Sequence, residues 1–112
     1  MVRPAKRTYS LYSQEAFNLL SKLIRTARIE QKLTVQEIAN RAGVSRGLVQ
    51  RIEKGDPKCE IGTVFEIATI VGVTLFETDQ SALRKHARQV EEKLALLPKS
   101  VRKQTKAVDD DF

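Results

Sequence analysis

Cysteine, histidine and long apolar runs are all scarce in this 112-residue chain. The single cysteine, Cys59, excludes an internal disulfide and fits a reducing compartment. No stretch approaches the ~18 consecutive apolar residues that a membrane span requires. The opening MVRPAKRTYS has charges but no apolar region behind it, unlike a secretory signal. We therefore expect a cytoplasmic, nucleoid-associated protein with no membrane partner.

Residues that carry chemistry are also few. His86 stands alone on a charged helix, and Cys59 is expected to be a small apolar filler without metal-binding partners. No nucleophile is paired with a base, no ligand pattern suggests a metal, and no glycine-rich loop suits a phosphate. We expect no catalysis, no metal and no cofactor.

Positive charge is in excess, with a formal net charge of +6 and a pI of about 9.7. Residues 1–33 carry seven Lys or Arg against two Glu, a net +5, whereas residues 34–76 carry five against five. Such a balance points to an anionic partner, nucleic acid first. Solubility alone would explain the charge equally well, so any role of the central cations must follow from their positions.

The apolar periodicity predicts an all-α fold with five helices. The expected spans are 14–31 (capped by Ser13), 34–41, 46–53, 61–71 and 79–97 (capped by Asp79). They divide the chain into four parts: a flexible basic arm (1–12), a helix-turn-helix domain (13–76), a C-terminal helix (77–98) and a flexible tail (99–112).

Two helices have predicted core faces. In the first, Phe17, Leu20, Ile24 and Ala27 repeat at helical spacing and Leu23 widens the stripe. Arg25 and Arg28 are placed off this stripe, equally open to solvent or to phosphate. The fourth helix begins after Glu60, a weak cap, and its expected buried residues are Ile61, Val64, Phe65, Ala68 and Val71.

The most informative stretch is LTVQEIANRAGVSRGLVQRIEKG, Leu33–Gly55. Its TVQE is a capping box at a helix start, and Ser45 can cap the next helix. Between them, Ala39 permits close helix crossing and Gly43 suits a turn that needs positive φ. Val44, Val49 and Ile52 would be buried, and Gly55 would end the second helix in a left-handed conformation. Two short helices with this alanine and glycine are a helix-turn-helix signature.

At the level of residues, 14–76 resembles the Cro/repressor (Xre) helix-turn-helix family. The matching residues are Thr34, Glu37, Ile38, Ala39, Ala42 to Ser45, Val49, Arg51 to Glu53, Gly55, Ile67, Ala68, Gly72 and Val73. One position departs from the family, which usually has a phosphate-contacting glutamine where this chain has Val35. Either Gln36 takes over part of that role or the domain does without it.

A DNA-reading edge follows from this architecture, in which the second helix of the motif enters the major groove. The expected base-reading residues are Ser45, Arg46, Gly47 and Gln50. Arg46 can pair with guanine and Gln50 with adenine through two hydrogen bonds each. Expected phosphate contacts are Gln36, Arg51, Lys54, Lys58, Thr63 and Arg7. Two alternatives stand: Arg51 in a structural ion pair instead, and Leu48 partly buried in the core rather than against a thymine methyl.

The last helix carries a narrow apolar seam that suggests a homodimer on a palindromic operator. Its residues follow a 4-3-4-3 spacing: Leu83, Ala87, Val90, Leu94 and Leu97. The alternative is that this helix folds back over its own core. Leu75 and Phe76 could belong to either surface.

More narrowly, the whole chain is similar to HipB-like antitoxins. The similarity lies in TYSLYSQEA, in QRIEKGDPKCEIGTVFEIATIVGVTLF, in LALLPKSVR and in the terminal AVDDDF. It implies autorepression of a toxin–antitoxin operon and binding to HipA-like Ser/Thr kinase subunits, with Asp109, Asp110, Asp111 and Phe112 as a docking segment. Two alternatives remain: a stand-alone repressor, and a protein-binding adaptor that no longer reads DNA.

Overall fold

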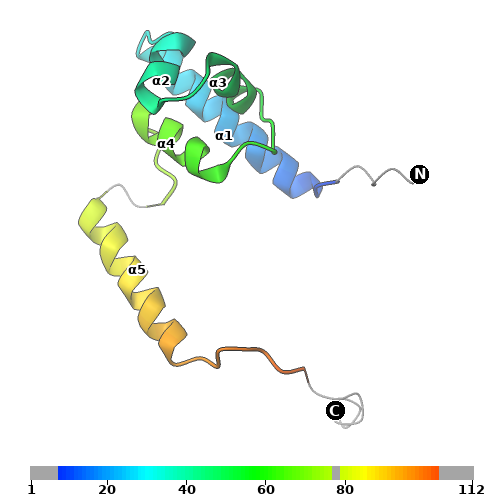
Figure 1. Ribbon diagram of the computed structural model, residues 1–112, viewed down its shortest axis with the longest axis vertical. Helices are drawn as coiled ribbons and strands as arrows, with labels where there is room; N and C mark the ends of the chain where they lie inside the picture. The colour runs from blue at the N-terminus through cyan, green and yellow to red at the C-terminus, as the bar shows by residue number, and fades with distance from the viewer. Residues whose placement is uncertain (1–7, 77–78, 104–112) are drawn as a thin grey trace. The chain divides into compact units, whose positions relative to one another are not determined.

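The computed structural model describes residues 8–76 and 79–103, and within them the fold is all-α, as predicted (Figure 1). The helices are α1 (Leu11–Glu30), α2 (Val35–Ala42), α3 (Arg46–Glu53), α4 (Ile61–Val71) and α5 (Gln80–Ala95). The chain divides into two compact units: the first, ending at Leu75, holds α1 to α4, and the second, beginning at Phe76, holds α5.

Helix α1 begins earlier than predicted. Ser10, in extended conformation, is the N-cap, and its hydroxyl accepts the Ser13 backbone N–H at 3.2 Å. Ser13 is therefore not the cap, and the first turn lies inside the stretch assigned to the arm. The first two residues of the helix, Leu11 and Tyr12, are 70% and 83% exposed, so this turn does not follow the apolar period of the core.

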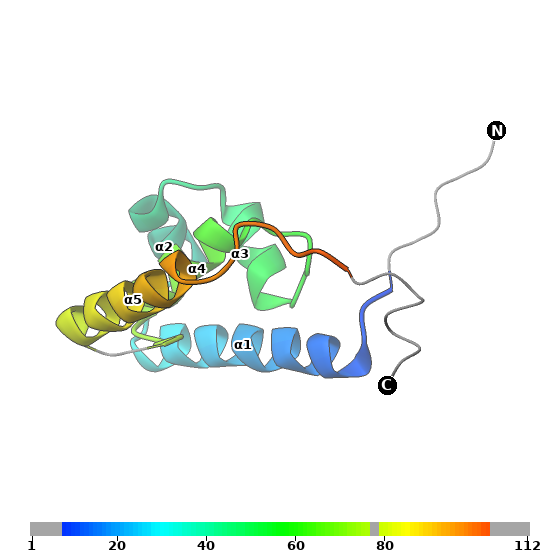
Figure 2. The same cartoon turned by 90° about the horizontal axis from the view of Figure 1, so that it is seen from below.

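Four side chains, one from each helix of the first unit, form the centre of the core: Ile24, Ile38, Val49 and Ile67, all fully buried. Helix α2 packs against α3 and α4, and α1 packs against the same two helices. Helices α2, α3 and α4 lie along one side of α1 (Figure 2). Burial of each such side chain contributes about 1.5–3 kcal/mol to folding.

The buried face of α4 is shifted from the prediction. Ile61, expected in the core, is 72% exposed because it starts the helix, one turn before the part that packs. The predicted Ala68 and Val71 are buried, Val64 and Phe65 are half-buried, and Ile67 is fully buried although it was not among the expected core residues. In α1, Leu23 also differs from the prediction, since it is 46% exposed.

Glycine is favoured just after the end of α3 by its backbone conformation. Gly55 has φ +82°, as predicted, and a Cβ there would lie 2.8 Å from Oδ1 of Asn18 on α1. A larger residue would be strained by the left-handed backbone, whereas the exposed Asn18 side chain can move aside. The short distance shows that the end of α3 lies close to α1, in keeping with the packing of these two helices.

Helix α5 is capped by Asp79, as predicted, and its carboxylate accepts the Ser81 backbone N–H at 3.2 Å. The helix ends at Ala95 rather than 97, and none of its residues is buried. Its predicted seam is exposed, with Leu94 at 61%. Within residues 8–76 and 79–103, no helix combines the length and apolarity that crossing a membrane would require.

Candidate nucleic-acid interface

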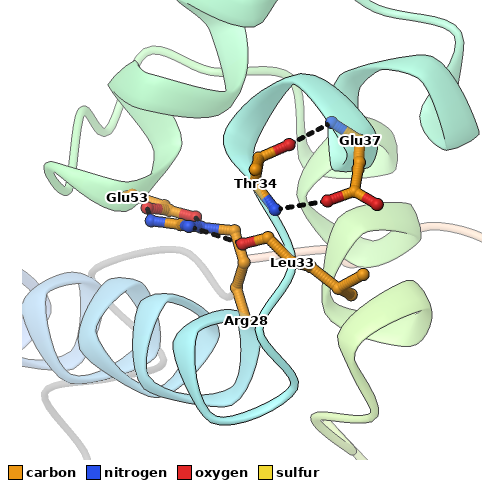
Figure 3. A network of polar contacts seen from close by, with 5 residues as sticks. All are labelled: Arg28, Leu33, Thr34, Glu37 and Glu53. Atoms are coloured by element: carbon orange, nitrogen blue, oxygen red, sulfur yellow. Dashed lines mark hydrogen bonds and ion pairs between the residues drawn. The ribbon is translucent and has the colours of Figure 1, made fainter.

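The predicted capping box at the start of α2 is confirmed. The Thr34 hydroxyl accepts the Glu37 backbone N–H at 3.0 Å, and the Glu37 carboxylate accepts the Thr34 backbone N–H at 2.9 Å (Figure 3). The Thr34 N–H, aided by the Thr34 side chain, holds the pKa of Glu37 below its ordinary value. The box fixes where α2 starts and therefore where the following turn falls.

The turn between α2 and α3 has the predicted form. Gly43 has φ +70°, and the N–H groups of Gly43 and Val44 return to the Ala39 carbonyl. Ala39 itself is fully buried, as expected where α2 and α3 cross. Ser45 then caps α3, because its hydroxyl accepts the Leu48 N–H at 3.1 Å. These contacts place the first turn of α3 at the surface.

The outer edge of α3 is open. Ser45, Arg46, Gly47 and Gln50 are all exposed, while Val49 is fully buried and Ile52 is only 3% exposed on the inner face. At Gly47 there is no heavy atom within 4 Å of the position a Cβ would occupy, apart from the local backbone. Leu48 is half-buried against the core, as expected. The edge therefore presents one guanidinium and one amide beside a residue with no side chain.

A buried ion pair between α1 and the last residue of α3 fixes the position of α3. It was not predicted from the sequence. Arg28 Nε lies 2.7 Å from Glu53 Oε2, Nη2 lies 2.9 Å from Oε1, and Nη1 donates to the Leu33 carbonyl at 2.9 Å (Figure 3). The two side chains are only 12% and 6% exposed. The hydrogen bond to Glu53 raises the pKa of Arg28.

The prediction for Arg28 was therefore wrong, since it is neither solvated nor placed to meet phosphate. The available signal was its spacing: Arg28 follows the fully buried Ile24 by four residues, which puts both on one helix face. A cation on a core face requires a buried acid, and only the packing of α1 on α3 identifies Glu53 as that acid.

Two of the expected phosphate contacts already have partners within the domain. The Gln36 amide donates to Asn40 Oδ1 at 2.9 Å. Arg51 Nε lies 3.1 Å from Asp56 Oδ2, so the structural ion pair left open by the sequence is present, with Asp56. The Asp56 hydrogen bond raises the pKa of Arg51, yet the Arg51 side chain remains 55% exposed.

The remaining expected phosphate contacts differ in accessibility. Lys54 and Lys58 are exposed, and the Lys58 backbone N–H donates to Asp56 at 2.9 Å. Thr63, in the first turn of α4, is half-buried. Arg7 lies outside the described residues.

Comparison with known families shows what this arrangement is. Residues 24–77 match the model of the Cro/repressor-type helix-turn-helix family. This segment is a helix-turn-helix domain. Its presence indicates a DNA-binding transcriptional regulator, and the matched family is one of DNA-binding domains that are typically not enzymes. No curated protein and no solved structure matched the chain.

The helix-turn-helix domain also accounts for Cys59. The thiol is half-buried against the core, and burial raises its pKa, as expected for an apolar filler. Across the part of the chain that the structure describes, no three His, Cys, Asp or Glu residues gather as metal ligands would.

Proposed function

We propose that the protein is a sequence-specific repressor whose α3 edge reads the major groove. The exposed edge formed by Ser45, Arg46, Gly47 and Gln50 carries this proposal. A guanidinium suits the two acceptors of guanine, and a carboxamide suits the acceptor and donor of adenine. The open space at Gly47 lets the backbone approach the bases closely.

Phosphate contacts then orient the domain on the duplex. Arg51 pairs with Asp56 through its ε N–H, yet its side chain remains 55% exposed, so part of the guanidinium can still reach a phosphate. Gln36 donates one amide hydrogen to Asn40 and retains a second, which can reach a phosphate as the glutamine at position 35 does in the family. Lys54 and Lys58 are exposed and can each contact a phosphate. Thr63 is half-buried but lies in the first turn of α4, where a phosphate can approach the helix N-terminus.

The proposed operator-binding species is a homodimer formed through α5. The seam of Leu83, Ala87, Val90, Leu94 and Leu97 lies along this helix. Its first four residues line an open, mainly apolar groove together with Phe76. An exposed seam of this spacing suits a second copy of the helix, and a two-fold dimer matches a palindromic site.

The regulator is further proposed to be an antitoxin that represses its own operon and binds HipA-like kinase subunits. The support is the sequence resemblance to HipB-like antitoxins over the arm, the central run and the terminal AVDDDF. The proposed docking residues Asp109, Asp110, Asp111 and Phe112 lie outside the described residues. Their three charges and one apolar anchor suit a linear motif that orders on binding.

Substitution of the reading edge tests the DNA assignment. Arg46→Ala or Gln50→Ala should weaken operator binding by roughly 5- to 150-fold, the equivalent of ~1–3 kcal/mol per base contact, and relax base preference at one position. Affinity for random duplex and thermal unfolding should change little. Lys58→Ala is the control, because a phosphate contact should weaken both duplexes alike. Equal losses for Arg46→Ala on both duplexes would contradict the reading role.

Co-purification with the products of neighbouring genes tests the antitoxin assignment. A kinase-like subunit that binds the full chain, and is lost when residues 107–112 are removed, supports direct docking. A neighbouring kinase that never associates leaves a repressor that acts on expression alone. Failure to shift DNA from the chain's own upstream region would instead favour the adaptor alternative.

A further inference from the structure

Helix α1 exposes a second apolar stripe that neither the core nor the reading edge uses. Tyr12, Leu19 and Leu23 are 83%, 59% and 46% exposed, and Ala16 between them is exposed too. The buried residues of α1, Ser21 and Ile24, lie on a different face of the helix. Helices α2, α3 and α4 pack along one side of α1 (Figure 2).

The spacing of this α1 stripe is 4-3-4 over residues 12–23. On an α-helix that pattern gives a straight, narrow seam suited to another helix crossing at about 20°. The small Ala16 leaves a gap that one large side chain of a facing helix can fill. The stripe thus fits a helix better than an extended peptide.

The charges beside the stripe identify that helix as a second copy of α1. Glu15 and Lys22 are exposed, lie seven residues apart and follow the same edge of the stripe. Among the described residues neither takes part in an ion pair. In an antiparallel pair with Ala16 opposite the partner's Leu19, Glu15 of each copy meets Lys22 of the other. A parallel pair would instead place Leu20 opposite Glu15.

We propose that α1 is a self-association surface, in which two copies pair antiparallel along residues 12–23 with two reciprocal Glu15–Lys22 ion pairs. The pairing is isologous, since each copy contributes the same patch around a two-fold axis. Together with the seam on α5, it would link DNA-bound dimers at neighbouring operators. The α1 pairing itself does not depend on DNA binding or on α5.

Sedimentation equilibrium of the full chain, up to about 1 mM because an interface this small is weak, tests the proposal. Leu19→Asp should lower the mass-average molecular weight at the highest concentrations to the value seen at low concentration, where the weak α1 pairing is absent. Ile29→Asp is the matched control, on the same helix and 51% exposed but off the stripe, and should leave the mass unchanged. Equal masses for wild type and Leu19→Asp, with both folded by circular dichroism, would overturn the pairing.

A charge exchange gives a test that does not alter the apolar stripe. Glu15→Lys and Lys22→Glu should each lower the mass, because each places like charges opposite each other across the axis. An equimolar mixture of the two variants should restore it, since every cross pair is then between opposite charges. A mixture that sediments as its separate components would overturn the proposal.

A variant in α5 separates this inference from the proposed operator-binding dimer. In a Leu94→Asp background, pairing through α1 should persist and remain sensitive to Glu15→Lys. Loss of all association in Leu94→Asp alone would assign self-association to α5 and overturn the role of α1. A full-length chain that does not bind the operator, yet keeps a mass that depends on Glu15 and Lys22, would count against the DNA assignment only.

Discussion

Arg28 joins three parts of the helix-turn-helix domain through one guanidinium. Its two bonds to Glu53 tie α1 to the last residue of α3, and its third reaches the Leu33 carbonyl just before α2. Arginine suits this position because its planar fork can serve a carboxylate and a carbonyl together. Helix α3 is therefore held at its C-terminal end, away from the edge proposed to read DNA.

We predict that Arg28→Ala lowers the free energy of unfolding by about 3 kcal/mol, because it leaves Glu53 buried without a partner. Arg28→Lys should recover only part of this loss, since an ammonium cannot form the same fork. Urea denaturation measures both. A loss below about 1 kcal/mol for Arg28→Ala would show that Glu53 finds water or another donor.

The Glu37 carboxylate gives the domain a defined response to acid. Its pKa is lower in the folded state than its ordinary value of 4.5 because the Thr34 backbone N–H donates to it. The stabilisation is therefore complete above the unfolded pKa and is lost as pH falls toward the folded pKa. Melting temperatures between about pH 7 and pH 3 should fall less steeply for Glu37→Gln than for wild type. If the melting temperatures of the two proteins fell in parallel with pH, Glu37 would not contribute to the acid response.

Among the elements, α3 is held by its context. Eight residues are too few for a stable isolated helix. Three features add the missing stability: the Ser45 cap, the burial of Val49 and Ile52, and the ion pair of Glu53. The opposite side of α3, with Arg46, Gly47 and Gln50, takes no part in these contacts and is exposed. It is the side proposed to contact bases.

Helix α4 begins with the weakest cap of the domain. Glu60 is the N-cap in extended conformation and makes no side-chain capping hydrogen bond. Glu60→Ser should therefore raise the free energy of unfolding by about 0.5–1 kcal/mol, because a short hydroxyl can accept an orphan N–H of the first turn. Chemical denaturation measures the gain. Glu66→Ser, at an exposed position inside the helix, is the control and should give no gain.

On the scale of the molecule, the DNA-binding unit is complete without α5. Its core lies within α1 to α4, and α5 contributes no buried residue. The apolar seam of α5 belongs to the second unit, and its pairing with a second copy is part of the proposed function. The surface proposed to read DNA thus lies in the first unit, and the surface proposed to pair the subunits lies on α5.

We predict that Leu94→Asp weakens the proposed α5 dimer at least tenfold, because it places a charge in the middle of an apolar seam. The melting temperature of the helix-turn-helix domain should be unchanged. Sedimentation at micromolar concentration measures the mass. Glu92→Asp, also exposed on α5 but off the seam, controls for a change in the helix itself. A dimer unaffected by Leu94→Asp would place the interface elsewhere.

Most helix ends and the exposed edge of α3 could be predicted from the sequence. Thr34 with Glu37, Ser45 and Asp79 cap the helices expected of them, and Gly43 has the expected conformation. These signals are local, because a cap and its N–H group lie within three residues of each other. The start of α1 was missed because Ser10 and Ser13 are both competent caps, and only the observed backbone selects Ser10.

The helix-turn-helix motif and the outward edge of α3 were already specified by the order of the residues, because caps, a positive-φ glycine and helical periodicity act over short distances along the chain. The pairing of Arg28 with Glu53, 25 positions away, and the exposure of Ile61 emerged only when the helices packed. So did the open stripe on α1. Such outcomes depend on which helix faces meet, and the faces of one helix do not specify the direction from which the next one packs.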